Sequence, residues 1–84
     1  MIAVVWSKRS RDDLRGLPAD VQRRVIDAMV RYAGTRHGDV TALKGRPGEY
    51  RLRVGDWRVL FALDAGRGEL LVQRVRHRRE AYRE

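Results

Sequence analysis

The stretch from Tyr50 to Phe61, YRLRVGDWRVLF, decides the fold of the second half of this chain. Apolar and basic side chains alternate on both sides of Gly55-Asp56, and this period places successive residues of a strand on opposite faces of a sheet. A two-residue turn at Gly55-Asp56 pairs Arg53 with Arg58 across a β-hairpin. The apolar residues then form a face for the core, whereas these arginines and Arg51 lie on the opposite face.

The segment before this hairpin supplies one strand and two helices. Ile2 to Trp6 is a short apolar run that predicts a first strand. Ser7 is a suitable N-cap for a helix that ends at about Gly16. From Pro18 to about Ala33, apolar residues recur at helical spacing and predict an amphipathic helix. Residues Gly34 to Gly48 hold four of the eight glycines and predict a loop.

A further strand is predicted from Leu70 to Val75, before a charged tail from Arg76 to Glu84. Residues 70–72 are apolar on both strand faces, which suits a strand that is buried on both sides. The predicted fold is α+β with the order βααβββ: an antiparallel meander sheet, two N-terminal helices packed on one face, and a short C-terminal helix or tail. The first strand is expected to join the sheet, and residues 1–84 to form a single domain.

Composition restricts the classes of function. The chain has 19 basic and 11 acidic residues and a net charge of +8, which favours polyanions or acidic proteins as partners. It lacks cysteine and any apolar run long enough for a membrane span, so we expect a cytoplasmic protein without disulfides. His37 and His77 have no carboxylate set nearby, and we expect neither a metal nor a cofactor. Only Lys8 and Lys44 are lysines, so the abundance of arginine carries less information than its position.

The arginines of the hairpin have two possible roles. Like charges directly across a sheet are unfavourable, but an anion that bridges Arg53 and Arg58 removes the repulsion. The planar guanidinium matches two phosphate oxygens, so phosphate binding is one interpretation. A solvated basic face is the other, and the alternation alone does not separate them.

The charged tail contains groups that can move a proton. Cleavage of a phosphodiester needs a base, cations for the growing charge and an acid. Arginine can only provide the cations, whereas Tyr82 and His77 are plausible proton carriers. An ordinary frayed basic end is the alternative interpretation of this segment.

The segments LKGRPGEYRLRVGDWRVLF (residues 43–61) and VRHRREAY (residues 75–82) closely resemble the RelE/ParE toxin superfamily. The resemblance spans essentially the whole chain. It implies a compact toxin that a co-expressed antitoxin neutralises. In the RelE-like branch, it implies a metal-independent endoribonuclease that cuts mRNA in the ribosomal A site, with the 2′-hydroxyl as nucleophile and a 2′,3′-cyclic phosphate as product.

The resemblance also implies roles for individual residues. Arg58 matches an arginine that contacts the scissile phosphate, and Arg78 matches a second arginine that stabilises the transition state. Tyr82 matches the C-terminal tyrosine that orients or deprotonates the 2′-hydroxyl. His77 falls near a histidine that some relatives use. Arg51 and Arg53 replace lysines of some nucleases, and Thr41 replaces a glutamate base, so electrostatic stabilisation should dominate. The expected site is therefore catalytic at Arg58, Arg78, Tyr82 and His77, and phosphate-binding at Arg51, Arg53, Arg76 and Lys44.

Two other functions remain open. A ParE-like toxin would inhibit DNA gyrase without cutting RNA, and the missing lysine and glutamate base favour it. A basic nucleic-acid-binding module without catalysis is the third possibility. Under either toxin interpretation, we expect an antitoxin with an acidic or amphipathic segment over the basic face, and operator DNA contacted only through that complex. For the nuclease, mRNA and the ribosome are the further partners, and no membrane is involved.

Overall fold

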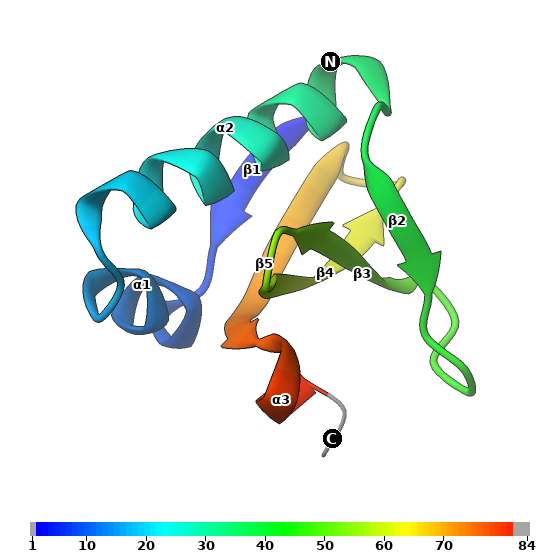
Figure 1. Cartoon of the computed structure of the whole chain (residues 1–84). Coiled ribbons are helices and arrows are strands. Elements are labelled where there is room, and N and C mark those ends of the chain that lie inside the picture. Colours follow the sequence, from blue (N-terminus) through cyan, green and yellow to red (C-terminus); the bar gives the residue numbers. More distant parts are fainter. Residues whose placement is uncertain (1, 82–84) are drawn as a thin grey trace.

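The computed structural model describes residues 2–81 and has an α+β fold (Figure 1). Residues 3–35 form one strand and two helices, and residues 39–81 form four strands and a short helix. In chain order the elements are β1 (Ala3–Trp6), α1 (Lys8–Arg15), α2 (Ala19–Thr35), β2 (Asp39–Ala42), β3 (Glu49–Val54), β4 (Trp57–Asp64), β5 (Glu69–His77) and α3 (Arg78–Ala81). The predicted fold class is confirmed, including the meander of β3, β4 and β5 and the short C-terminal helix.

All five strands form one sheet in the order β1-β5-β4-β3-β2. The meander pairs are antiparallel, and β2 pairs antiparallel with β3. The first strand joins the sheet beside β5 and runs parallel to it. The parallel pair needs a long connection, which α1, α2 and the meander provide.

The predicted hairpin has the expected register. Val54 pairs with Trp57, Arg53 with Arg58, and Leu52 with Val59. Gly55 has a φ of 59°, and Asp56 is not among the residues with positive φ. A positive φ at the first turn position alone is the pattern of a type II′ turn, which matches the right-handed twist of the flanking strands.

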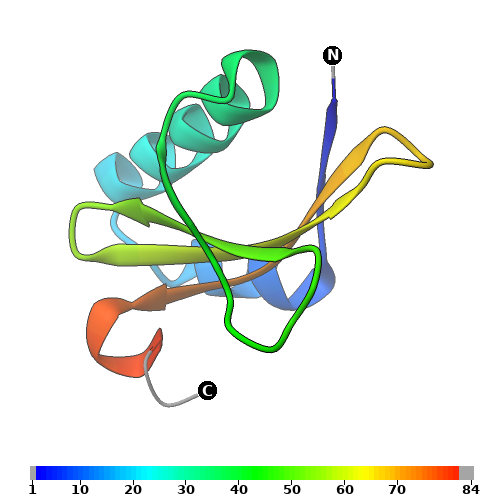
Figure 2. The same ribbon diagram turned by 90° about the vertical axis from the view of Figure 1, so that its right-hand side faces the viewer.

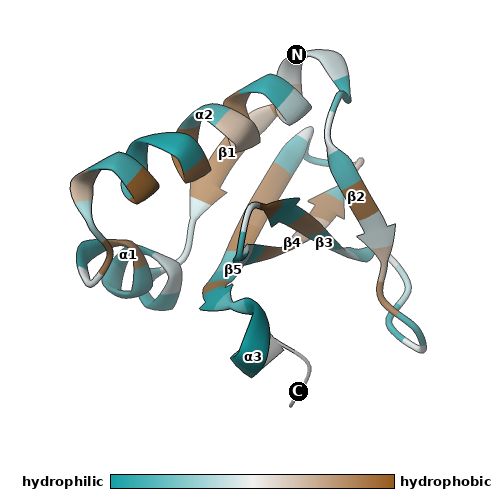
Figure 3. Ribbon diagram, in the orientation of Figure 1, coloured by the Kyte–Doolittle hydropathy of each residue, from teal (hydrophilic) through white to brown (hydrophobic). Residues whose placement is uncertain are grey.

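The core lies between the sheet and the two long helices, which cover the same face of the sheet (Figure 1). Phe61, Val59 and Val25 are fully buried, and the ring of Phe61 lies 5.4 Å from that of Tyr32 on α2. The apolar segments of α2 and of the strands appear brown in Figure 3, whereas α3 is mostly hydrophilic. Within residues 2–81, no helix has the length and apolar character needed to cross a membrane.

One part of the predicted loop is wrong, because Asp39–Ala42 forms the edge strand β2. This strand carries little apolar pattern of its own, since only Val40 among its residues is even partly buried. Its order comes instead from pairing with β3, in which Asp39 lies opposite Arg53 and Thr41 opposite Arg51. Backbone pairing of this kind leaves no periodic signal in the sequence.

The prediction that β5 is buried on both sides is also wrong. Leu70 and Val72 are fully buried against the helices, but Leu71 points to the other face and is 38% exposed. The two long helices occupy only one face, so the opposite face of the sheet is open at this position.

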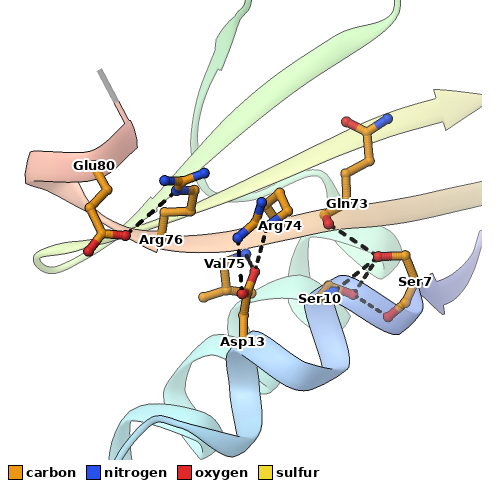
Figure 4. Close-up of polar contacts among 8 residues, drawn as sticks. All are labelled: Ser7, Ser10, Asp13, Gln73, Arg74, Val75, Arg76 and Glu80. Carbon is orange, nitrogen blue, oxygen red and sulfur yellow. Dashed lines mark hydrogen bonds and ion pairs between the residues drawn. The ribbon is translucent and has the colours of Figure 1, made fainter. Parts of the chain in front are cut away.

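The second half of β5 is held by α1 rather than by β1 (Figure 4). The β1 pairing ends at Val72, and a bulge follows, because Leu60 pairs with Arg74 while Phe61 pairs with Val72. Beyond the bulge, the Asp13 carboxylate accepts hydrogen bonds from the backbone N–H of Val75 (2.9 Å) and from Arg74 Nε (3.0 Å). This carboxylate covers backbone groups that an uncovered sheet edge would leave unpaired.

The N-cap of α1 adds a second contact to the same edge. Ser7 Oγ accepts a hydrogen bond from the Ser10 N–H, as predicted for a capping residue. The same hydroxyl donates to the carbonyl oxygen of Gln73 at 3.1 Å. The start of α1 is therefore attached directly to the bulge of β5.

We predict that Asp13→Ala lowers the free energy of unfolding by about 1–3 kcal/mol, because it removes a carboxylate that accepts hydrogen bonds from the partly buried Arg74 guanidinium and from the backbone N–H of Val75. The neighbouring Asp12 is the matched control, since its side chain is 47% exposed and, within residues 2–81, pairs with exposed cations of α1. Asp12→Ala should cost less than about 0.5 kcal/mol. Urea denaturation of both variants measures the difference, and equal losses would contradict the proposed role of Asp13.

Candidate functional site

A row of charged residues crosses four strands on the open face of the sheet. Asp39 of β2 pairs with Arg53, Arg53 pairs with Arg58, and Arg58 pairs with Arg76. Neighbouring strands lie about 4.8 Å apart, so the Cα atoms of these three arginines lie within about 10 Å of one another. We call Arg51, Arg53, Arg58 and Arg76 the arginine face.

The two outer arginines of the row each have a carboxylate partner. Arg53 Nε lies 3.7 Å from Asp39 Oδ2, and the Arg53 side chain is 63% exposed. Arg76 Nε lies 3.7 Å from Glu80 Oε2 of α3 (Figure 4). These acidic groups reduce the repulsion that like charges directly across a sheet would otherwise produce.

The central arginine is arranged differently. Arg58 is only 7% exposed, and its Nη1 donates to the carbonyl oxygens of Gly55 (2.8 Å) and Trp57 (2.9 Å). Among residues 2–81, no carboxylate forms an ion pair with it. Burial of a cation is costly unless an anion is present. The arrangement is therefore suited to binding an anion between Arg53 and Arg76.

A second row lies one step further along the strands. It contains Arg51 of β3, Leu60 of β4 and Arg74 of β5. Arg74 is engaged by Asp13 through both carboxylate oxygens, at 3.0 and 3.3 Å. Arg51 is half-buried and extends the arginine face toward the start of β3. The two rows thus differ in the partner of their β5 arginine. Arg74 binds a carboxylate of α1 at 3.0 Å, whereas Arg76 contacts a carboxylate of α3 at 3.7 Å.

Arg78 begins α3 and contacts the β3–β4 turn. Its backbone N–H donates to the Asp56 carbonyl at 2.8 Å, and its guanidinium lies 3.9 Å from the Asp56 carboxylate. Figure 2 shows α3 beside this turn, at one end of the sheet. Because Arg76 precedes it by two residues and Glu80 contacts Arg76, Arg78 lies close to the charged row.

His77 is placed on the other face of the sheet. It pairs with Trp57, and the two rings meet edge to face with centroids 5.2 Å apart. Its Nδ1 accepts a hydrogen bond from the Arg79 N–H at 3.3 Å. Trp57 and His77 share the strand parity of the buried Val59 and Val75, whereas Arg58 and Arg76 have the opposite parity. His77 is near the row in sequence but faces away from it.

The remaining two predicted residues do not add contacts to the row. Lys44 lies exposed in the connection from β2 to β3, at the opposite end of β3 from the Gly55-Asp56 turn. Tyr82 lies outside the described residues. The structure therefore brings together Arg51, Arg53, Arg58 and Arg76, with Arg78 at their margin.

Sequence reasoning missed three features of this site. It paired Arg53 with Arg58 but did not place Arg76 in the same row, because the β5 register depends on the bulge at Gln73. It placed Arg58 on the correct face, away from the core, but did not predict that this residue is buried there. It also missed the role of Asp13, a residue near the end of α1 whose contact with β5 has no local sequence signal.

Comparison with known proteins supports the same family as the motifs. The sequence profile of the family described as "ParE toxin of type II toxin-antitoxin system, parDE" matches residues 4–82. No individually curated protein matches the chain at a significant level.

Several solved structures share the fold. The RelB-RelE antitoxin-toxin complex from Methanococcus jannaschii matches with a TM-score of 0.77 and 22% identity, over 94% of this chain and 95% of that one. The RelBE2 toxin-antitoxin complex from Mycobacterium tuberculosis matches with a TM-score of 0.73 and 25% identity, over 90% of this chain and 96% of that one. The isolated RelE toxin of E. coli matches with a TM-score of 0.79 and 15% identity, over 99% of this chain and 97% of that one.

The profile match covers nearly the whole chain, and the structural matches cover nearly the whole of each relative. The fold, the hairpin motif and the profile therefore agree. The chain belongs to the ParE toxin family within the RelE/ParE superfamily, and it is the toxin of a type II toxin–antitoxin system.

Proposed function

We propose that this toxin is a metal-independent endoribonuclease that cleaves mRNA, with the scissile phosphate bound at the arginine face. The 2′-hydroxyl of the RNA attacks the adjacent phosphorus, the bond to the 5′-oxygen breaks, and a 2′,3′-cyclic phosphate and a free 5′-hydroxyl result. The proton lost by the 2′-hydroxyl and the proton gained by the 5′-oxygen balance. Negative charge grows on the phosphate oxygens in between, where fixed cations act best.

The observation that carries this proposal is the state of Arg58. It is buried at the centre of a row of three arginines, and no carboxylate of residues 2–81 neutralises it. Its two neighbours in the row hold carboxylates through contacts of 3.7 Å, which a phosphate can displace. A phosphate with two anionic charges in the transition state fits such a row better than a neutral ligand does.

The roles of the other residues follow from their positions. Arg53, Arg76 and Arg51 would hold neighbouring phosphates, and Lys44 would contact RNA further along. Arg78, at the start of α3, would contribute a second cation to the transition state. Tyr82 and His77 remain the proposed proton carriers. His77 faces away from the row, so this proposal gives Tyr82 the larger part in activating the 2′-hydroxyl.

The partners of the proposed reaction are mRNA and the A site of the ribosome. A type II toxin has a cognate antitoxin, and the related complexes from Methanococcus jannaschii and Mycobacterium tuberculosis were solved with theirs. We further propose that the chain acts in the cytoplasm and contacts operator DNA only through its antitoxin.

Inhibition of DNA gyrase without RNA cleavage is the second candidate function. The description of the matching family as ParE toxins favours it. The arginine face favours it too, because Arg51 and Arg53 cannot exchange a proton as a lysine can. The two candidates predict different damage in the cell, namely cut mRNA or gyrase-linked breaks in DNA.

The binding part of the proposal makes a prediction about stability. Arg58→Met should leave the free energy of unfolding within about 1 kcal/mol of wild type, because replacing a buried cation by an apolar side chain removes its desolvation cost. Inorganic phosphate at constant ionic strength should raise the melting temperature of the wild type but not of Arg58→Met, since a ligand stabilises only the state that binds it. A large loss of stability in Arg58→Met would instead assign Arg58 to support of the Gly55-Asp56 turn.

The catalytic part makes a prediction about mRNA. Induced expression of the wild type should arrest growth and produce discrete cleavages in mapped transcripts. Arg58→Ala should reduce cleavage by at least about a hundredfold, the typical cost of removing a group that stabilises transition-state charge. Arg67→Ala is the matched control, because this arginine is 77% exposed in the β4–β5 turn, away from the row.

Cleavage should also fail on a substrate with 2′-deoxyribose at the cut position, which lacks the attacking hydroxyl. Equal toxicity of wild type and Arg58→Ala with intact mRNA would exclude the nuclease. Gyrase-linked double-strand breaks in the same cells would then identify the second candidate.

A further inference from the structure

The open face of the sheet has a second, apolar end. Val5 of β1 pairs with Leu71 of β5, and Leu71 pairs with Ala62 of β4. Val5 and Leu71 are each 38% exposed, which makes them unusual among the large apolar residues of the strands. We call Val5, Ala62 and Leu71 the apolar end of the open face.

The apolar end lines a groove of about 560 Å³. The β4–β5 hairpin forms one wall of the groove through Asp64, Ala65, Arg67 and Glu69. Its floor is the same face of the sheet that carries the arginine face, and on β4 the buried Leu60 lies between the two. Exposed apolar side chains that gather in a groove commonly mark a site for another molecule.

Nucleic acid is a poor occupant of this groove. Asp64 and Glu69 line it beside the cation Arg67, whose Nε lies 3.9 Å from Asp64 Oδ2. Glu49 pairs with Ala62 in the same row, so carboxylates outnumber cations around the apolar side chains. Phosphates would be repelled there. The apolar end also offers only aliphatic side chains and no aromatic ring on which a base can stack.

A second copy of the chain is also a poor occupant. An isologous dimer through this face would bring the two arginine faces toward each other. Each copy carries a net charge of +8, so such a dimer would concentrate like charges. The occupant therefore has to combine apolar side chains with acidic ones.

The spacing of the two ends suits a single segment of a partner. Ala62 lies four residues beyond Arg58 on β4, which corresponds to about 13 Å along the strand. An α-helix of about nine residues spans the same distance. A helix or strand with apolar residues at one end and acidic residues at the other would thus cover both ends at once.

We propose that the apolar end is the docking surface for apolar side chains of the cognate antitoxin, and that acidic side chains of the same antitoxin segment cover the arginine face. The proposal requires only that the chain is a type II toxin, and it holds whether the toxin cuts RNA or inhibits gyrase. Under this proposal the open face has two parts that bind different ligands. The arginine face binds either nucleic-acid phosphates or acidic side chains of the antitoxin, whereas the apolar end binds the antitoxin alone.

The test uses the double variant Val5→Thr/Leu71→Thr, because threonine keeps the strand preference but removes the apolar surface. Val30→Thr is the matched control, since Val30 is 59% exposed on α2, away from this face. Isothermal titration measures binding of the purified cognate antitoxin. A short single-stranded oligonucleotide of 2′-deoxyribonucleotides measures binding of phosphates to the arginine face.

The double variant should weaken antitoxin binding by about tenfold or more and leave oligonucleotide binding within about twofold, as expected for loss of a buried apolar anchor. Val30→Thr should change neither. Unchanged antitoxin affinity in the double variant would overturn the proposal, as would equal losses of antitoxin and oligonucleotide. A wild-type dimer that the double variant dissociates, seen by sedimentation, would assign the surface to a second copy instead.

These outcomes are independent of the proposed nuclease. Thermal unfolding verifies that the double variant is folded. If it is not, the single variant Val5→Thr on the shorter strand β1 carries the same test with the same two titrations. Failure of the wild type to cut mRNA would not alter the antitoxin titration, so each proposal fails separately.

Discussion

The row of Arg53, Arg58 and Arg76 exists only because β4 pairs with both of its neighbours in one register. The three side chains repel one another, so the row does not form by their attraction. It forms because the opposite face of the same strands is buried, with Phe61 and Val59 fully enclosed. A slip by one residue would move Phe61 to the open face and Arg58 into the core, and both changes are costly. The apolar face thus enforces the arrangement of the charged one.

The position of Arg76 depends on a second constraint, which acts at the edge of β5. The pairing with β1 ends at Val72, and the bulge that follows reverses the strand parity, so that Val72 and Val75 both reach the core. Without the extra residue, Arg74 and Arg76 would point toward the helices. The Asp13 carboxylate then holds the strand beyond the bulge through Arg74 and the N–H of Val75. One carboxylate of α1 therefore helps to present the β5 end of the arginine face.

The parts of the structure that the sequence predicted are those governed by local rules. The turn at Gly55-Asp56, the N-cap at Ser7 and the period of α2 each depend on a few neighbouring residues, and all three are confirmed. The parts that it did not predict depend on long-range pairing. The strand β2 is ordered by β3, and Arg76 faces Arg58 because of a bulge at Gln73. Arg58 shares the alternation of Arg53, yet only the folded chain shows that one is buried and the other exposed.

The two parts of the open face explain how one surface can bind nucleic acid and the antitoxin with different affinities. Any polyanion gains from the arginine face, so charge alone cannot favour an antitoxin over nucleic acid, which is far more abundant in the cell. Discrimination needs a contact that only one partner can make. Under our proposal, Val5 and Leu71 provide it, because an aliphatic groove with acidic margins adds binding energy for a protein segment and none for phosphate. Both ligands would then compete for the arginines, and the apolar end would decide the competition.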